Sequence, residues 1–313
     1  MKITKIIDSI VRGAPGIGIM ITYSLLAIFG YTFGYGNGGN FQIVIIAMLA
    51  VSSIFALGAT NILDDYFDYS NGIDAVGDAN SETRTHLIVH GYLSPKETLI
   101  LGLSLICVPA AFMIYLMVFG NRFFVLLYAA ISVFILLEYA GPPLKYRYHN
   151  FGEIGVFASN VITISGSFYV STGHLNIIPV IISLPPALII SLLAFLGNTR
   201  DINTDTKKGI HTISMKLGEK KSGIVYGTFF LISYVLVVLD VVEKIFPFIS
   251  LVVLSTFPFA LWHIYKIITN GAPPNAEKVG GLISMFFTGA LIASIVVQAF
   301  CFLLISSSKE QNK

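Results

Sequence analysis

The sequence predicts an all-α protein that crosses a membrane nine times. Of its 313 residues, 55% are hydrophobic and 12% are charged, whereas soluble domains carry about 25% charged residues. Charged residues gather in the connections between long apolar segments, because a charge in the hydrocarbon core is costly. A helix needs about 20 mostly apolar residues to cross that core. Nine segments meet this requirement or come close to it: 15–36, 42–63, 98–119, 123–141, 154–173, 177–197, 222–240, 246–265 and 280–306.

The stretch before the first span is amphipathic, and we expect it to form an interfacial helix. Its apolar residues are Ile3, Ile6, Ile7, Ile10 and Val11, set against Lys2, Lys5 and Arg12. No small-residue cleavage site follows the first apolar segment, so no cleavable signal peptide is predicted, and residues 1–313 form a single membrane domain. Cys107 and Cys301 lie in apolar segments, which predicts no disulfide framework and no cysteine metal site.

The basic residues are divided unequally between the two sides of the predicted bundle. With nine spans, only Arg122, Lys244, Lys309 and Lys313 of the 19 Lys and Arg lie on the side opposite the N-terminus. The positive-inside rule therefore predicts a cell-membrane protein with a cytoplasmic N-terminus and an outer C-terminus. Two long polar connections, 64–97 and 198–221, then face the cytoplasm, and long connections tend to carry function.

These two connections share an acidic motif. Residues 61–74 read NILDDYFDYSNGID, and residues 198–209 read NTRDINTDTKKG. The common skeleton is Asn, two residues, Asp, three residues, Asp: Asn61, Asp64 and Asp68 in the first motif, and Asn198, Asp201 and Asp205 in the second. Four spans separate the motifs, which predicts two pseudo-repeated four-helix halves in parallel topology plus one helix.

The motif spacing predicts a magnesium site. On a helix, side chains at i, i+3 and i+7 share one face, and Asp65 joins the face of Asn61. Two like charges about 6 Å apart repel by roughly 3 kcal/mol at an effective dielectric of 20, so the clustered carboxylates require cations. Oxygen ligands without His or Cys favour Mg²⁺ held together with a phosphate substrate. The candidate metal ligands are Asn61, Asp64, Asp65, Asp68, Asp201 and Asp205. The alternative, two solvated acidic faces, explains one motif better than a matched pair.

Basic and amide side chains near the motifs are candidates to bind a diphosphate and to neutralise its charge as it leaves. They are Arg12, Arg84, Lys145, Asn198, Arg200, Lys207 and Lys208, and Arg147 lies in the same connection as Lys145. The alternative for part of this set is that the residues serve only as topology signals. A net charge of +2 and the lack of a basic run argue against a nucleic-acid partner.

The motif residues resemble the two signature loops of the UbiA superfamily of intramembrane prenyltransferases. The similar runs are DDYFDYSNGID, NTRDINTDTKKGIHTISMKLG and, for the middle cytoplasmic loop, EYAGPPLKYRYHNFGEIGVF at residues 138–157. The resemblance covers nearly the whole chain and is strongest to the branch that prenylates dihydroxynaphthoate in menaquinone synthesis. The sequence departs from the family pattern at Asp64, where Asn is usual, at His86, where Arg is common, and at Gly197, where a second Asn is frequent.

The resemblance implies a nine-span fold and a Mg²⁺-dependent transfer of a prenyl group from a polyprenyl diphosphate to an aromatic acceptor such as dihydroxynaphthoate. It also implies that Asn61, Asp64, Asp65 and Asp68, with Asp201 and Asp205, hold magnesium against the diphosphate. Two substrates and membrane lipid are then the expected partners, without an obligate protein partner. Competing interpretations are transfer to an oxygen of a lipid acceptor and an ion-coupled transporter. Transporters place ionisable groups near the midplane, where this chain has none.

Three residues outside the metal and diphosphate sets are candidates for chemistry or specificity. Tyr139, at the predicted pocket mouth, stabilises an allylic cation through its ring or only packs at the interface. Asp68 and Asp201 are the catalytic acids, with Asp68 either a general base or only a ligand. Asn160, with Thr163 and Ser167 at helical spacing, lines an acceptor pocket or mediates helix packing.

Overall fold

The computed structural model describes residues 2–75 and 85–311, and within them the regular structure is helical apart from one isolated bridge between His149 and His211. The helices, in chain order, are α1 (Lys2–Val11), α2 (Gly13–Gly36), α3 (Ile43–Ser70), α5 (Pro95–Gly120), α6 (Val125–Ala140), η1 (Tyr146–Tyr148), α7 (Gly152–Thr172), α8 (Ile178–Arg200), α9 (Ile202–Lys207), α10 (Ile213–Leu217), α11 (Glu219–Val242), η2 (Phe248–Thr256), α12 (Phe257–Asn270) and α13 (Ala276–Gln311).

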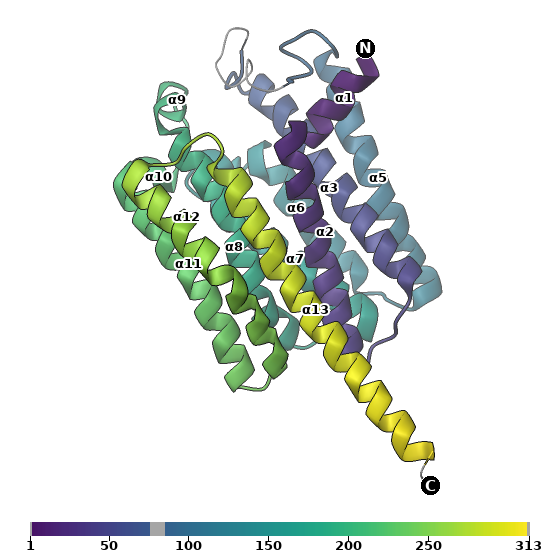
Figure 1. The fold of residues 1–313 in the computed structure, drawn as a ribbon. Coiled ribbons are helices and arrows are strands. Elements are labelled where there is room, and N and C mark those ends of the chain that lie inside the picture. The colour runs from purple at the N-terminus through teal and green to yellow at the C-terminus, as the bar shows by residue number, and fades with distance from the viewer. Residues whose placement is uncertain (1, 76–84, 312–313) are drawn as a thin grey trace.

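Eight helical segments within the described residues are long and apolar enough to cross a membrane. They are α2, α3, α5, α7, α8, α11, the continuous η2–α12 segment and α13. The shorter apolar helix α6 occupies the fourth predicted span. The predicted all-α, multi-pass fold is therefore confirmed. The N-terminal stretch forms α1, a separate helix that lies at the end of the bundle opposite the C-terminus (Figure 1). Which side of a membrane this end faces stays a prediction.

Several segment boundaries differ from the sequence prediction. Helix α3 continues to Ser70, so the acids of the first motif lie on a helix and not in the predicted loop 64–97. The helix continues because these acids pair with two partly buried cations, Arg12 and Arg147, and do not turn outward to solvent. The predicted loop 198–221 contains the end of α8 and the short helices α9 and α10. The eighth span begins as the 3-10 helix η2 before it continues as α12.

Helix α2 lies at the centre of the bundle, in contact with α3, α7 and α13. Glycine allows its close approach to α7, since a Cβ on Gly30 would lie 2.2 Å from the carbonyl oxygen of Ile164. One buried apolar cluster fills the space among α2, α7, α8, α11, α12 and α13. A second cluster lies among α2, α3, α5, α6 and α7, toward the end of the bundle opposite α1. Large exposed apolar side chains such as Val51, Ile114 and Val235 cover the flanks, as expected of a surface that faces lipid.

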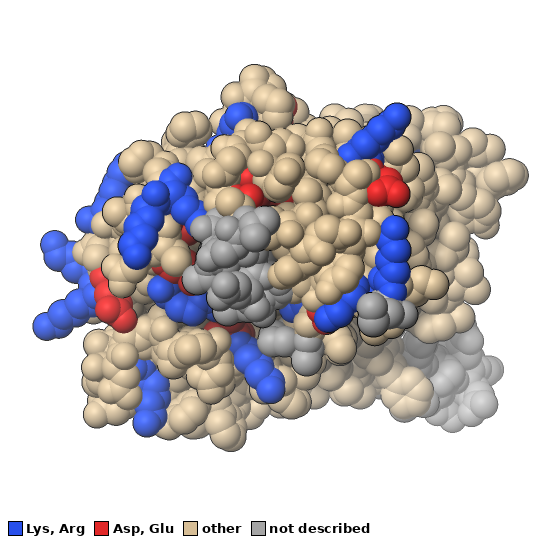
Figure 2. Space-filling view, turned by 90° about the horizontal axis from the view of Figure 1, so that it is seen from above, with Lys and Arg blue, Asp and Glu red and all other residues tan. Residues whose placement is uncertain are grey.

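The end of the bundle that carries α1, α9 and α10 is strongly basic. Seen from above, Lys and Arg side chains are spread over this face, while little Asp or Glu surface is visible (Figure 2). Arg122 and Lys244 lie instead in the connections after α5 and α11, at the opposite end of the bundle. Of the acidic residues in the two motifs, Asp64, Asp65, Asp68 and Asp205 are buried.

Candidate active site

The last turns of α3 present three buried carboxylates at the basic end of the bundle. Asp64, Asp65 and Asp68 are 6%, 1% and 2% exposed. Carboxylates at this depth must be paired, because an isolated buried charge is too costly to keep. Helical spacing places them on adjoining positions of one face, so their partners must come from elsewhere in the chain.

Two guanidinium groups bind these carboxylates. Arg12 Nη2 lies 2.7 Å from Asp64 Oδ2 and 3.6 Å from Asp65 Oδ1. Arg147 Nη1 donates to Asp64 Oδ1 and, at 3.1 Å, to Asp68 Oδ2. From α1, Ser9 Oγ also donates to Asp65 Oδ2 at 3.2 Å. The first motif is thus neutralised by cations from the N-terminus of α2 and from the middle connection.

The middle connection is built to hold Arg147 in place. Tyr148, the next residue, donates its hydroxyl to Asp68, and burial together with Asp68 raises the pKa of Tyr148, so it remains a neutral donor. Burial lowers the pKa of Arg147, but Asp64 and Asp68 raise it by more, which keeps the guanidinium charged. The His211 backbone N–H donates to the Tyr148 carbonyl, and the His211 carbonyl accepts from Asn150, so the connection is tied to the second motif's segment.

The second motif spans the junction of α8 and α9. Asp201 ends α8, and its side chain, 27% exposed, accepts hydrogen bonds from its neighbour Arg200 at 2.7 and 2.8 Å. Asp205 is buried, and burial together with Asp201 raises its pKa to about 6 against the opposing effect of Arg147, Lys208 and Arg200. Arg147, which binds Asp64 and Asp68, thus also influences the pKa of Asp205 in the second motif.

A direct contact between the motif segments involves Asp74, which the sequence analysis did not single out. Asp74 is 4% exposed, its backbone N–H donates to the Asp68 carbonyl, and its carboxylate accepts from Lys208 at 2.8 Å. His86 Nε2 lies 3.6 Å from the same carboxylate. The sequence signal was the Gly-Ile-Asp that closes the first motif, because Gly72 has φ of 73° and returns the chain toward α3. Ser9 and Tyr148 were likewise absent from the predicted site set, and Arg147 was considered only as a diphosphate-binding candidate beside Lys145.

The other predicted site residues have diverse contacts. Asn61 donates to the Ile10 carbonyl, and its own carbonyl accepts from Arg12. Lys145 donates to the side chain of Asn71, not to a carboxylate. Asn198 donates to Glu153 at 2.8 Å, and Arg200 also pairs with Glu277 at 2.9 Å. Lys207 is exposed, and Arg84 lies outside the described residues. These contacts link Asn61 to the Arg12 cluster and leave the diphosphate roles of the others as predictions.

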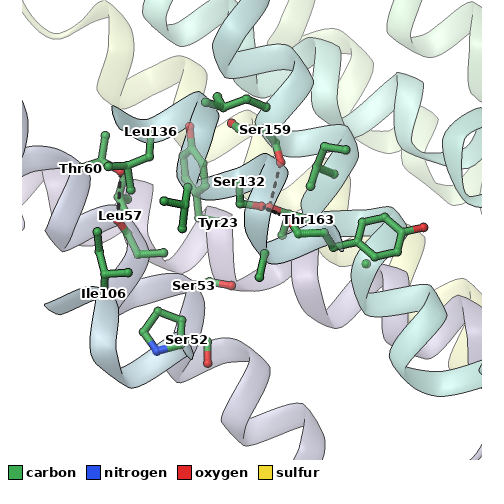
Figure 3. A pocket seen from close by; sticks show the side chains of 18 of the residues that line it. Tyr23, Ser52, Ser53, Leu57, Thr60, Ile106, Ser132, Leu136, Ser159 and Thr163 are labelled. Atoms are coloured by element: carbon green, nitrogen blue, oxygen red, sulfur yellow. Dashed lines mark hydrogen bonds between the residues drawn. The ribbon is translucent and has the colours of Figure 1, made fainter. Parts of the chain in front are cut away.

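An elongated cavity of about 360 Å³ begins at Arg12, Asn61 and Asp64 and runs into the bundle among α2, α3, α5, α6 and α7. This volume is within the range of about 300–1,000 Å³ that is typical of small-molecule sites. Its wall contains several hydroxyl residues (Figure 3). Ser53, Thr60, Ser132, Ser159 and Thr163 each donate to a backbone carbonyl of their own helix. The wall is therefore less polar than its composition suggests.

Two predicted residues differ in their relation to the cavity. Tyr139 lines its mouth, where the guanidinium carbon of Arg147 lies 5.5 Å from the ring centroid. Asn160 is fully buried on α7 but does not line the cavity, and its amide donates to the Ala187 carbonyl of α8 at 3.4 Å. This contact between α7 and α8 agrees with the helix-packing alternative for Asn160, and its role in an acceptor pocket stays a prediction. Thr163 and Ser167 do line the cavity.

The chemistry of the donors suits magnesium. Asp64 and Asp68 direct carboxylate oxygens at a single nitrogen of Arg147, which shows that two acidic groups converge on one cation. All neighbouring acids offer oxygen, the donor that Mg²⁺ prefers. No group of three or more His, Cys, Asp or Glu within residues 2–75 and 85–311 is already arranged as a metal-binding cluster. The residue types fit the ion, and the guanidinium groups occupy the neutralising positions.

Comparison with known proteins adds the relationships of the chain. A profile of the UbiA prenyltransferase family matches residues 23–290. The 1,4-dihydroxy-2-naphthoate octaprenyltransferase of Bacillus subtilis is 26% identical over 264 residues, 82% of this chain and 83% of that protein. A UbiA homolog from Archaeoglobus fulgidus, solved with GPP and Mg²⁺, shares the fold with a TM-score of 0.65 at 15% identity, over 93% of this chain and 99% of that chain. A digeranylgeranylglyceryl phosphate synthase structure has a TM-score of 0.63 at 19% identity, over 95% and 98% of the two chains.

The fold and site define a multi-pass membrane protein in which buried carboxylates and arginines stand at the mouth of an apolar cavity. Because the family profile covers most of its length, the chain belongs to the UbiA prenyltransferase family, and it is a prenyltransferase.

Proposed function

We propose that this prenyltransferase transfers the prenyl group of a polyprenyl diphosphate to a carbon of an aromatic, quinone-precursor acceptor of the dihydroxynaphthoate type. The observation that carries the proposal is the direct junction of an apolar cavity with a charged cluster at Arg12, Asn61 and Asp64. A molecule with a long hydrocarbon tail and a charged head matches this junction. The 26% identity to a dihydroxynaphthoate octaprenyltransferase supports the acceptor class.

Asp64, Asp65, Asp68, Asp201 and Asp205, with Asn61, would hold magnesium. A bound Mg²⁺ supplies charge stabilisation to the diphosphate as the allylic C–O bond breaks. The A. fulgidus homolog solved with GPP and Mg²⁺ supports this requirement. Arg12 and Arg147 already lie among these carboxylates, and guanidinium groups bind phosphate oxygens in bidentate fashion. When a diphosphate enters, these arginines exchange a carboxylate partner for a phosphate partner.

The remaining groups act on the organic substrates. The apolar wall excludes water from the allylic cation, and the ring of Tyr139 at the cavity mouth stabilises its positive charge. A nucleophilic aromatic carbon then forms the new C–C bond, diphosphate departs, and the aromatic carbon loses its proton. Asp68 is our candidate to accept that proton, because Tyr148 and Arg147 fix its carboxylate beside the site.

Purified protein in lipid vesicles, supplied with Mg²⁺, prenyl diphosphate and a panel of acceptors, tests the proposal by mass spectrometry. We expect a carbon-prenylated aromatic product that disappears when the metal is chelated. An ether product on a lipid acceptor would instead establish oxygen alkylation. Product formed at the full rate under thorough chelation would refute the magnesium requirement.

A further inference from the structure

Glu277, in the first turn of α13, reaches the second acidic motif from outside it. Its Oε1 lies 2.9 Å from Nη1 of Arg200, while Nε and Nη2 of the same guanidinium donate to the two carboxylate oxygens of Asp201 at 2.8 and 2.7 Å. Asp201 and Arg12 also act electrostatically on the Glu277 carboxylate. Arg200 is therefore held on two sides, by its neighbour in the chain and by a distant helix.

A glycine gives the Glu277 carboxylate its place. A Cβ on Gly197 of α8 would lie 2.6 Å from Glu277 Oε1, well below the optimal separation of about 3.5 Å for non-bonded atoms. Gly197 lies inside a helix and has no positive φ, so its backbone does not require glycine, which costs about 1 kcal/mol there relative to alanine. At this position, where the sequence departs from the family pattern, the space of a side chain is taken by Glu277.

The guanidinium edge that binds Asp201 is the edge that suits a phosphate. Nε and Nη2 are parallel donors, and a phosphate accepts from such a pair in bidentate fashion. Asp201, 27% exposed, is a proposed magnesium ligand, and this edge becomes free when its carboxylate turns to the metal. The Arg200 side chain is 35% exposed, and without another partner it would regain rotamer freedom that binding has to remove. The contact with Glu277 uses Nη1 and persists.

We propose that Glu277 is a positioning residue for diphosphate binding: it holds Arg200 through Nη1, so that the Nε–Nη2 edge stays directed at the site when Asp201 releases it. The inference rests on the proposed function. Because the pair is partly exposed, Glu277→Ala should raise the KM for prenyl diphosphate by about threefold and leave kcat nearly unchanged. Glu277→Gln keeps an oxygen acceptor for Nη1 and should restore most of the affinity. In an Arg200→Gln background, Glu277→Ala should have no further effect.

Gly197 supplies an independent way to move the same carboxylate. In Gly197→Ala the added Cβ displaces Glu277 Oε1 from Arg200, and the KM for prenyl diphosphate should again rise by about threefold. In the Glu277→Ala background the new methyl group has no carboxylate to displace and should leave KM unchanged. The two substitutions are therefore expected to be non-additive, as are changes at residues in direct contact.

The experiment measures kcat and KM in lipid vesicles, together with the magnesium concentration for half-maximal activity, which should not change because Glu277 is not a metal ligand in this proposal. Matched controls are Glu243→Ala, exposed after the last turn of α11, and Gly289→Ala, where nothing lies within 4 Å of the added Cβ; neither should change KM. If Gly197→Ala fails to fold, the comparison of Glu277→Ala with Glu277→Gln decides.

An unchanged KM in Glu277→Ala, no recovery in Glu277→Gln, or additive effects of the two alanines would overturn the positioning role while leaving prenyl transfer intact. A raised magnesium requirement without a change in KM would also overturn it, and would make Glu277 a metal ligand. No prenylated product from the unsubstituted protein would instead overturn the proposed function.

Discussion

The two acidic motifs have the same spacing of Asn and Asp but very different surroundings. In the first motif, Asp64 and Asp68 are buried and are held by Arg147, which is about 80 residues away in sequence. In the second motif, Asp201 is partly exposed and is held by the adjacent Arg200. The arrangement around Asp64 and Asp68 depends on the tertiary fold, whereas Asp201 is paired with its neighbour in sequence, Arg200, which is itself anchored to Glu277. We therefore infer that the first motif is the preformed half of the proposed site, and that the partly exposed Asp201 of the second motif is the part that adapts.

The largest expected effect is that of Asp68→Asn, which should lower kcat by on the order of 10³, because a preorganised charge at the reacting centre is lost. Turnover in vesicles with saturating magnesium checks the prediction. Asp240→Asn, a buried acid near the end of α11 remote from the site, is the matched control and should retain activity. Near-normal turnover by the Asp68 variant would refute both the proposed difference between the two motifs and the proposed site.

Asp201→Asn should have a smaller effect, a loss of about 10² or less in kcat, since its partly exposed carboxylate acts in a more screened environment. The same turnover assay compares it directly with the Asp68 variant. Insertion and thermal stability of both variants should match those of the unsubstituted protein. A loss equal to or greater than that of Asp68→Asn would show that the adaptable half, not the preformed half, limits the reaction.

Arg147→Gln tests whether this guanidinium competes with Mg²⁺ for the carboxylates and binds the diphosphate when it enters. We expect kcat to fall about tenfold because a phosphate contact is lost. The magnesium concentration for half-maximal activity should fall as well, since Asp64 and Asp68 lose a competing cation. Arg200→Gln is the equivalent change at the second motif and should move both quantities less. A rise in the magnesium requirement of the Arg147 variant would contradict the competition.

The pH dependence should report on the second motif. Burial and Asp201 raise the pKa of Asp205 to about 6, so its carboxylate is ionised above that pH and becomes protonated as the pH falls below it. Because a proton competes with the metal for the ligand, the magnesium concentration for half-maximal activity should rise about tenfold between pH 7 and pH 5. Excess magnesium should restore the rate at pH 5. In Asp205→Asn this dependence should weaken, and an unchanged profile would exclude Asp205 as its source.

Tyr148→Phe should give the smallest effect. It removes one hydrogen bond to Asp68, a contribution of about 1 kcal/mol, and so should cost about fivefold in kcat. Tyr265→Phe, a substitution of the same kind at an exposed position on α12, serves as the matched control. A loss of the size seen for Asp68→Asn would mean that Tyr148 takes part in proton transfer and does not merely orient the acid.

The fold was accessible from the sequence because hydrophobic length determines it. Apolar segments of membrane-crossing length predicted the helices, and the repeated Asn–Asp spacing located both motifs. The ends of helices were harder to predict. Charged residues such as Asp64 and Asp68 suggested a loop, but in the structure they extend α3 because Arg12 and Arg147 neutralise them inside the bundle. Hydropathy alone contains no information about such distant partners.

The site was predicted only in part, because contacts between residues distant in sequence cannot be read from the sequence pattern. Acids that repeat at regular intervals are visible in a sequence, whereas single residues such as Asp74, Tyr148 and Ser9 join the site only through folding. Asn160 shows a second limit of the sequence pattern. Its helical spacing to Thr163 and Ser167 suggested a shared pocket, but it points toward α8, since a spacing pattern cannot tell which of two neighbouring helices a polar side chain will face.

The hydroxyl-bearing wall of the cavity has a consequence for the design of inhibitors. The hydroxyl groups of Ser53, Thr60, Ser132, Ser159 and Thr163 each donate their hydrogen bond to a main-chain carbonyl. A carbonyl or ether oxygen placed in a tail-mimicking compound would obtain no donor from these five and would still lose its hydration. A branched hydrocarbon tail should therefore bind more tightly than an oxygenated analogue of the same length. The hydroxyl-bearing residue types along the wall would suggest the reverse.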